Sequence, residues 1–193
     1  MQRIEICGGI AAGKTTLAGI FEEKGYRVLY ERFEDNPFLK DFYKNLGLDN
    51  TLETEISFVM LHSYLVKSCR EFHSVVCDFS LLQDYAYGFS NLSNEDYKIF
   101  QQIYGHFTNR FTKPDIIIYL QCDIECLLER LHKRGRADEQ TITADYLHKT
   151  VKELEEQLKH YNNVLTLRSD EYDFMTKDRD FIYQKIIDCI KIN

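Results

Sequence analysis

The sequence has neither a long basic stretch nor a long run of apolar residues. Its 193 residues carry a formal net charge of −7, which argues against a nucleic-acid polymer as the main ligand and favours a small anionic one. No apolar window is long enough to cross a membrane, and glycines and Lys14 interrupt the first twenty residues, which therefore do not resemble a signal peptide. We expect a cytoplasmic protein that does not associate with membranes.

The cysteines also lack the spacing of a metal or disulfide motif. None of the six forms a Cys-x-x-Cys pair, and four of them fall in or beside predicted strands and helices, which favours reduced thiols in a cytoplasm. Cys122 and Cys126 lie close together, but no second close pair completes a four-ligand site. We therefore expect core or surface thiols.

Short apolar strands alternate with helical patterns along the chain, and no repeat, linker or low-complexity segment interrupts them. Strands are predicted at residues 3–7, 28–30, 75–77, 116–120 and 164–167. Helices are predicted at residues 14–24, 38–43, 52–72, 94–111, 124–133, 144–161 and 178–192, with a loop at 47–50. This alternation predicts a single α/β domain over residues 1–193, with a five-stranded parallel sheet and helices on both faces.

A glycine-rich segment follows the first predicted strand and leads into a helix. Residues 8–15 read Gly-Gly-Ile-Ala-Ala-Gly-Lys-Thr. In such a phosphate loop, backbone N–H groups converge on phosphate oxygens, Lys14 reaches the outer phosphates and the Thr15 hydroxyl serves Mg²⁺. A chance glycine-rich turn is the alternative, but the strand-loop-helix context favours the P-loop kinase fold. The predicted ATP-binding residues are Gly8, Gly9, Ile10, Ala11, Ala12, Gly13, Lys14, Thr15, Thr16, Arg130 and Arg134.

Positive charge gathers where a predicted helix ends at Gly135. Arg130, Arg134 and Arg136 lie within seven residues of an otherwise acidic chain, and the planar guanidinium group binds phosphate in a bidentate manner. The alternative is a solvated helix end whose cations interact with the helix dipole. Beside a phosphate loop, an arginine-rich lid that closes over phosphates is favoured.

Two carboxylates directly follow predicted parallel strands. Glu31 follows the second strand and Asp78 the third, and the carboxyl ends of strands form the ligand crevice of open α/β sheets. One carboxylate would orient or deprotonate a substrate hydroxyl while the other organises Mg²⁺. Helix capping is the alternative role for both.

Several ordered motifs between residues 4 and 174 resemble those of the deoxynucleoside kinases. The segment Glu-Arg-Phe-Glu-Asp-Asn-Pro-Phe-Leu at residues 31–39 is similar to the bacterial form of the family's glutamate motif, which implies that Glu31 is the general base on the nucleoside 5′-hydroxyl. The Phe-Tyr pair at residues 42–43 implies that Tyr43 binds the sugar 3′-hydroxyl. Glu55 falls where the family places a Gln or Glu against the nucleobase.

The second half of the resemblance runs from residue 78 to residue 139. Asp-Phe-Ser at residues 78–80, followed by Asp84, has the spacing of the family's acidic-Arg-Ser motif and its base-binding aspartate. The resemblance implies Mg²⁺ organisation for Asp78 and base recognition for Asp84. The segment from Arg134 to Glu139 resembles the lid, in which Glu139 would bind the 3′-hydroxyl.

The chain departs from the family pattern at two positions. Phe79 occupies a position where most members of the family carry a substrate-site arginine and some bacterial relatives carry an aromatic residue, and His62 occupies the position of another substrate-site arginine. Glu55 and His62 share a helix face because seven residues make two turns. By itself, such a pair usually lies on the protein surface. Arg32 and Arg110 are candidates for a replacement charge, and the sequence places neither in the pocket.

The resemblance implies ATP-dependent phosphorylation of the 5′-hydroxyl of a purine deoxynucleoside, such as deoxyadenosine or deoxyguanosine, in nucleotide salvage, by a homodimer. A nucleoside monophosphate kinase of the thymidylate type, or a regulatory nucleotide-binding protein with weak turnover, are the alternatives. The predicted catalytic residues are Glu31, Lys14, Arg134 and Arg136. The predicted substrate-binding residues are Glu31, Tyr43, Glu55, His62, Phe79, Asp84 and Glu139, and Thr15 and Asp78 are the predicted Mg²⁺ ligands.

Overall fold

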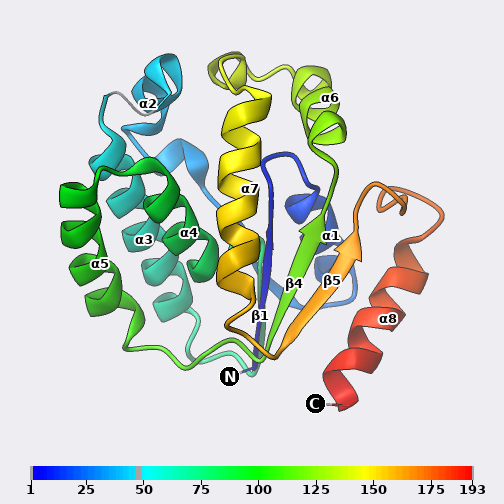
Figure 1. The fold of residues 1–193 in the computed structure, drawn as a ribbon. Coiled ribbons are helices and arrows are strands. Elements are labelled where there is room, and N and C mark those ends of the chain that lie inside the picture. Colours follow the sequence, from blue (N-terminus) through cyan, green and yellow to red (C-terminus); the bar gives the residue numbers. More distant parts are fainter. Residues whose placement is uncertain (1, 47–48, 193) are drawn as a thin grey trace.

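Five parallel strands form the centre of the computed structural model, which describes residues 2–46 and 49–192 (Figure 1). The sheet has the order β2-β3-β1-β4-β5, and its four neighbouring pairs are all parallel. Its members are β1 (Gln2–Gly8), β2 (Arg27–Leu29), β3 (Ser74–Cys77), β4 (Ile116–Gln121) and β5 (Val164–Arg168). The predicted five-stranded parallel sheet is therefore confirmed. Residues 47 and 48 of the predicted loop lie outside the described residues.

Helices cover both faces of this sheet, as predicted. Figure 1 shows α7 in front of β1, with α4, α3 and α5 beside it, and α1 behind the sheet. The α-helices are α1 (Lys14–Glu23), α2 (Leu39–Asn45), α3 (Thr51–Ser68), α4 (Leu81–Asn91), α5 (Asn94–Thr108), α6 (Ile124–Arg134), α7 (Ala144–Leu158) and α8 (Arg179–Ile192). Two short 3₁₀ helices, η1 (Phe33–Asp35) and η2 (Ala137–Glu139), lie between them.

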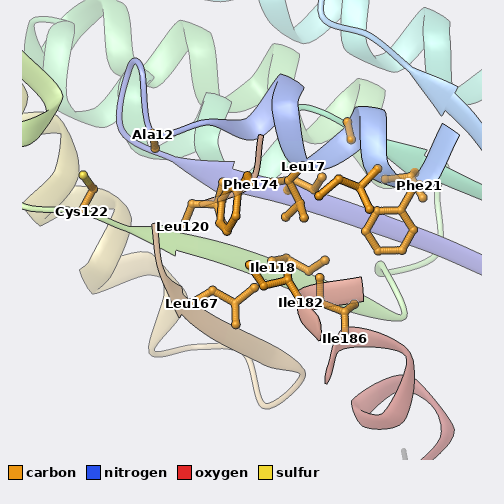
Figure 2. Packing of buried hydrophobic residues seen from close by; sticks show 14 of the residues in the cluster. Ala12, Leu17, Phe21, Ile118, Leu120, Cys122, Leu167, Phe174, Ile182 and Ile186 are labelled. Atoms are coloured by element: carbon orange, nitrogen blue, oxygen red, sulfur yellow. The ribbon is translucent and has the colours of Figure 1, made fainter. Parts of the chain in front are cut away.

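The strands are apolar on both sides because both faces of the sheet are buried. On one face, Ile118 and Leu120 of β4 pack with Leu17 of α1 and Ile182 of α8 (Figure 2). On the other face, the side chains of Ile117 and Tyr119 pack with residues of α4 and α7. Alternate residues of one strand thus enter two different layers of the core.

The structure contains one helix that the sequence reading left unassigned. Ser80 is the N-cap residue of helix α4, and its Oγ accepts a hydrogen bond from the Leu82 N–H at 3.2 Å. The same hydroxyl donates to Glu5 Oε2 at 2.7 Å and thereby ties the helix start to β1. A serine followed by apolar residues at helical spacing was the available signal.

Several predicted helices end earlier in the structure than their patterns suggested. Helix α3 stops at Ser68 instead of residue 72, because the chain must turn before β3 begins at Ser74. Helices α5 and α7 each end three residues before their predicted ends. None of the helices in the described ranges is long and apolar enough to span a membrane.

Candidate active site

A cavity of about 550 Å³ opens at the carboxyl ends of β1, β2 and β3. Its wall comes from the loop after β1, the segment after β2, helices α2, α3, α4 and α7, and the region from α6 to η2. Ligand pockets of this size, about 300–1,000 Å³, bury most of a drug-sized molecule. In open α/β sheets, ligands bind beside the strand at which the order of the sheet reverses, and here that strand is β1.

The loop after β1 has the backbone geometry that makes glycine necessary. Gly13 precedes α1 at φ 99°, a conformation that residues with a Cβ rarely adopt. A Cβ on Gly8 would lie 2.7 Å from the Leu120 carbonyl oxygen, so no larger residue fits there. The Lys14 ammonium donates to the carbonyl oxygens of Gly8 and Gly9 at 3.2 and 3.4 Å. The start of the loop is therefore bound to the ammonium group of Lys14, the first residue of α1.

Glu31 and Asp78 meet at the ends of neighbouring strands. The Glu31 N–H donates a short hydrogen bond to Asp78 Oδ1. Burial raises the pKa of Asp78, while the Glu31 N–H, the Thr15 hydroxyl and Lys14 partly oppose that shift. Burial also acts on Glu31, but His62, Lys14 and Arg136 outweigh it and hold the pKa of that carboxyl below its usual value. Glu31 is therefore ionised at neutral pH.

The oxygens of Thr15 and Asp78 fit the chemistry of Mg²⁺. This ion binds through one or two carboxylates together with substrate phosphates, and it seldom has a cage made only of protein ligands. Both residues line the cavity beside the loop. Within the described ranges, no group of three or more His, Cys, Asp and Glu residues forms a cage for a metal ion.

Three arginines line the cavity from helix α6 and the segment that follows it. Arg134 donates from Nε and Nη2 to Glu139 Oε2 at 3.1 and 2.5 Å, and Arg136 donates from Nη1 to Oε1 of the same residue at 3.2 Å. The Arg136 guanidinium also lies 4.0 Å from the centre of the Phe33 ring, a cation–π contact. Arg130 donates to the Ser169 carbonyl oxygen at 2.6 Å. One buried glutamate thus holds both lid arginines beside the cavity.

The far end of the cavity is lined by a buried carboxyl group and aromatic rings. Glu55 is 3% exposed, and its Oε1 accepts a hydrogen bond from Asn91 Nδ2 at 2.8 Å. The Asn91 amide also contacts the Tyr146 hydroxyl at 3.2 Å. Burial raises the pKa of Glu55 to about 8, with a further increase from Asp84. At neutral pH this carboxyl therefore carries a proton.

His62 and Phe79 lie behind this wall. Their rings are stacked with centroids 4.0 Å apart and planes 7° apart, and both side chains are almost fully buried. His62 Nδ1 lies 2.9 Å from both carboxylate oxygens of Asp84, and Nε2 lies 3.5 Å from Glu31 Oε1. His62 therefore contacts Asp84 and Glu31, which line the cavity, and Phe79 supports His62 from behind.

The cavity brings most of the predicted site residues together. Ile10 to Thr16, Glu31, Tyr43, Glu55, Asp78, Asp84, Arg130, Arg134, Arg136 and Glu139 line it. Gly8, Gly9, His62 and Phe79 are outside this set. Arg32 pairs with Asp35 at 3.8 Å and Arg110 with His106 at 2.8 Å, both at exposed positions away from the lining.

The sequence reading missed several lining residues, most of them aromatic. Among them, Gln83 has a defined contact: its Oε1 accepts a hydrogen bond from the Gly8 N–H at 3.0 Å and so ties α4 to the start of the loop. The chain has 13 Tyr and 13 Phe residues, and their local sequence does not show which of them line a cavity. The lining residues not predicted are Tyr30, Phe33, Leu39, Phe42, Thr54, Phe58, Gln83, Tyr87 and Tyr146.

Comparison with known families identifies this arrangement. The sequence model of the family described as deoxynucleoside kinase matches residues 4–191 of the chain. The chain belongs to the deoxynucleoside kinase family. It is therefore a phosphotransferase, and membership implies a nucleotide as phosphoryl donor. The resemblance stated from the motifs is confirmed.

Several relatives of this deoxynucleoside kinase are bacterial enzymes. A deoxyguanosine kinase from Bacillus subtilis is 31% identical, over 92% of this chain and 91% of the relative. A deoxyadenosine kinase from Lactobacillus acidophilus is 28% identical, over 91% and 89%. The structure of a deoxyadenosine kinase from M. mycoides with products dCMP and a flexible dCDP bound superposes with a TM-score of 0.85, at 26% identity over 97% of this chain and 100% of that one. A second structure of the M. mycoides enzyme, with dATP bound, has a TM-score of 0.81.

Proposed function

We propose that this deoxynucleoside kinase transfers the γ-phosphoryl group of ATP to the 5′-hydroxyl of a purine deoxynucleoside and serves nucleotide salvage. The observation that carries the proposal is the division of charge within one cavity. Lys14 and three arginines line the cavity from the start of α1 and from the region from α6 to η2, whereas the part lined by α3 and α4 carries Glu55 and Asp84 and no Lys or Arg. A triphosphate fits the cationic end, and an uncharged acceptor fits the end without cations.

Glu31 is the general base in this proposal. Its side chain is 28% exposed at the cavity wall, and its ionised state, supported by Lys14 and Arg136, is the one that accepts a proton from a hydroxyl. Lys14, Arg134 and Arg136 neutralise the charge that develops on the transferred phosphoryl group, because phosphoryl transfer depends mainly on positioning and electrostatic stabilisation. Arg130 supports the loop side of the donor site.

Thr15 and Asp78 would hold Mg²⁺ at the loop. When bound, the ion supplies charge neutralisation between the donor phosphates. The short bond from the Glu31 N–H to Asp78 then keeps the general base next to the metal ligand. The two carboxylates have separate tasks, although they lie on adjacent strand ends.

Tyr43 and Glu139 are assigned to the sugar 3′-hydroxyl. Both line the cavity, and Thr141, two residues after Glu139, donates a short hydrogen bond to the Tyr43 carbonyl oxygen. The lid and helix α2 are thus joined where the sugar would bind. Because Glu139 also binds Arg134 and Arg136, sugar binding and lid closure would use the same carboxylate.

Glu55 and Asp84 are assigned to the nucleobase. A protonated Glu55 presents one O–H donor and one acceptor, which matches the N1 acceptor and N6 amino donor of adenine. The ionised group presents acceptors only and matches the N1–H and amino donors of guanine. The named relatives, deoxyguanosine and deoxyadenosine kinases at about 30% identity, support a purine.

The two alternative functions are less consistent with the residues that line the cavity. A nucleoside monophosphate kinase must hold a second phosphate at the acceptor, and such a site calls for cations; here Glu31, Glu55 and Asp84 line that end. A regulatory nucleotide-binding protein would have no use for an ionised general base beside a phosphate loop. We therefore keep catalysis on an uncharged nucleoside as the leading proposal.

We further propose a cytoplasmic homodimer in which residues 1–193 form one domain. The family match spans nearly the whole chain, and no two cysteines in the described part form a disulfide. Large apolar side chains are exposed on α3 and α5, among them Tyr64 at 68% and Ile99 at 49%. Light scattering coupled to size-exclusion chromatography tests the dimer, and a monomeric mass would contradict it.

The test of the function compares acceptors directly. Steady-state phosphorylation is measured for the four deoxynucleosides and their monophosphates, with ATP and Mg²⁺, on the wild type, on Glu31→Gln and on Glu34→Gln, an exposed neighbour. We expect turnover of a purine deoxynucleoside that falls by about 10²–10⁴ in Glu31→Gln only. Turnover of monophosphates alone, or ATP binding without turnover of any acceptor, would overturn the proposal.

A further inference from the structure

His62 differs from the other histidines of the chain. It is 2% exposed, whereas His73, His106, His132, His148 and His160 are all exposed. One face of its ring is covered by Phe79, and Phe58 packs nearby with a centroid distance of 5.7 Å. The ring face thus contacts an aromatic side chain, whereas the two ring nitrogens point toward polar groups.

Both ring nitrogens face carboxylates. Nδ1 contacts both oxygens of Asp84 at 2.9 Å, and Nε2 lies 3.5 Å from Glu31 Oε1 without a hydrogen-bond partner in the described part of the chain. A neutral imidazole has one donor and one acceptor nitrogen, and an acceptor nitrogen facing a carboxylate is repelled. The imidazolium donates from both nitrogens, so it is the form that matches both neighbours.

We propose that His62 is a positioning residue, a buried imidazolium that joins Asp84 to Glu31 and holds the general base toward the reacting hydroxyl. The inference depends on the role proposed above for Glu31. The Nε2 to Oε1 distance exceeds that of a hydrogen bond, and contacts of this kind tighten when substrate binds. His62 thus supplies the inner positive charge, while Lys14 and Arg136 act on Glu31 from the phosphate end.

The electrostatic balance around the ring supports a charged His62. Burial lowers the pKa of His62, but Asp84 on α4 and Glu31 after β2 outweigh it and raise that pKa to about 10. Phe79, after β3, and Phe58, on the same helix, bring no charge. Burial raises the pKa of Asp84, His62 opposes that shift, and Glu31 and Glu5 of β1 add to it. Without this cation, an ionised Asp84 would be buried with no counter-charge, which is costly in a protein interior.

Phe79 fixes the orientation of the His62 imidazole. The parallel stack fixes the ring plane, and this plane directs Nδ1 to Asp84 and Nε2 to Glu31. A longer cation at position 79 would compete for the same carboxylates. The stacked pair therefore combines one cation of fixed orientation with one neutral support.

The consequence for function is a link between the two halves of the acceptor site. Asp84 is assigned to the base and Glu31 to the hydroxyl, and both hold the same imidazolium. Loss of His62 leaves the sugar and phosphate contacts in place but releases Glu31. We expect kcat to fall more than KM rises, because misplacement of a catalytic group affects the chemical step most strongly.

The first measurement does not require activity. ¹⁵N-histidine-labelled wild-type protein is observed by NMR from pH 6 to 9, and His62→Asn assigns the His62 signals by their loss. We expect both His62 nitrogens to remain protonated at pH 8. Nuclear Overhauser contacts between the His62 and Phe79 rings, which are stacked 4.0 Å apart, assign the same signals in the wild type if the variant fails to fold. A His62 signal with one unprotonated nitrogen at pH 8 would overturn the inference.

The second measurement is kinetic. His62→Asn keeps a donor toward Asp84 but loses the charge and the reach to Glu31; His62→Arg restores a cation; His160→Asn is the exposed control. We expect kcat of His62→Asn to fall about tenfold to a hundredfold, with a smaller change in KM, partial recovery in His62→Arg, and no change in His160→Asn. An unchanged kcat in folded His62→Asn contradicts the inference. Full activity of Glu31→Gln instead contradicts the proposed function, so the two failures are distinguishable.

Discussion

The two ends of the cavity are built in different ways. At the phosphate end, consecutive backbone groups and a few cations form the binding site. Gly13 precedes α1 at φ 99°, and the Lys14 ammonium donates a hydrogen bond to the Gly8 carbonyl oxygen. At the nucleoside end, side chains from α2, α3, α4 and α7 converge. There, Glu55 of α3 is held by Asn91 of α4, and Asp84 of α4 by His62 of α3. The comparison teaches that binding of charge can be local, whereas recognition of a neutral nucleoside requires the assembled fold.

The largest effect is expected from breaking the cationic end. Lys14→Met removes the ammonium held at the Gly8 and Gly9 carbonyl oxygens, and kcat/KM for the deoxynucleoside with ATP should fall by about 10²–10³, the usual loss when one preorganised electrostatic contact is removed. Steady-state kinetics measure it. Lys40→Met, an exposed lysine on α2, serves as the control, and a comparable loss in that variant would rule out a specific role for Lys14.

A smaller effect is expected where the two ends meet at Glu139. This carboxylate holds Arg134 and Arg136 and is assigned to the sugar. Glu139→Gln should lower kcat/KM for a deoxynucleoside by about 10- to 100-fold, since hydrogen bonds to charged groups contribute about 1.5–3 kcal/mol. Asp138→Asn, at the exposed neighbouring position, should leave it unchanged.

The 3′-hydroxyl contact can be separated from lid closure by changing the substrate. A 2′,3′-dideoxynucleoside lacks the hydroxyl, so the Glu139→Gln effect should shrink when that analogue is phosphorylated. An equal loss for both substrates would place Glu139 in the lid alone. The comparison thus assigns the residue to one end of the cavity or to both.

The smallest effect concerns base choice at Glu55. Its pKa of about 8 means that the neutral form dominates at pH 7 and the ionised form above pH 8, so the ratio of kcat/KM for deoxyadenosine to that for deoxyguanosine should fall as pH rises through 8. We expect a change of about tenfold between pH 6.5 and 9, equivalent to about 1.4 kcal/mol. The ratio should be nearly constant in Glu55→Gln, which always presents one donor and one acceptor. The groups that face Glu55 are Asp84 and Tyr87 of α4 and Tyr146 of α7.

Stability provides a second readout for the same carboxyl group. The pKa of Glu55 is raised on folding, so its contribution to stability is fully present below about pH 4.5 and is lost as pH rises through about 8. Wild-type Tm should therefore decline between pH 5 and 9 more than that of Glu55→Gln. Glu53→Gln, exposed on the same helix, should follow the wild type. Parallel declines in all three proteins would contradict the raised pKa.

The strands and most helices were predicted from the sequence because their apolar patterns are strong. The five strands were all found, since a parallel sheet buried on both faces requires continuous apolar runs such as residues 116–120. Helix α4 was missed although Ser80 and its apolar spacing marked it. The ends of α3, α5 and α7 were placed too late, because helical periodicity does not show where the chain must turn toward the next strand.

The residues of the candidate site likewise divide into those that the sequence predicted and those that it did not. Glu31 and Asp78 were selected because they follow strands, and both line the cavity. Tyr87, Tyr146 and Gln83 were not selected, since nothing in their local sequence distinguishes a lining residue from a core residue. His62 was placed among substrate contacts, whereas the structure places it behind Asp84 and Glu31.

The sequence by itself determined the phosphate loop, the α/β order and the acidic residues at strand ends, because each depends on residues that are consecutive or directly follow a strand. Tertiary structure alone decided that the imidazole of His62 reaches a carboxylate 22 residues away on α4 and another beyond β2. It also decided that Asn91 meets Glu55 across 36 residues. Charge states of buried groups depend on such distant neighbours, since burial and partner charges set them together.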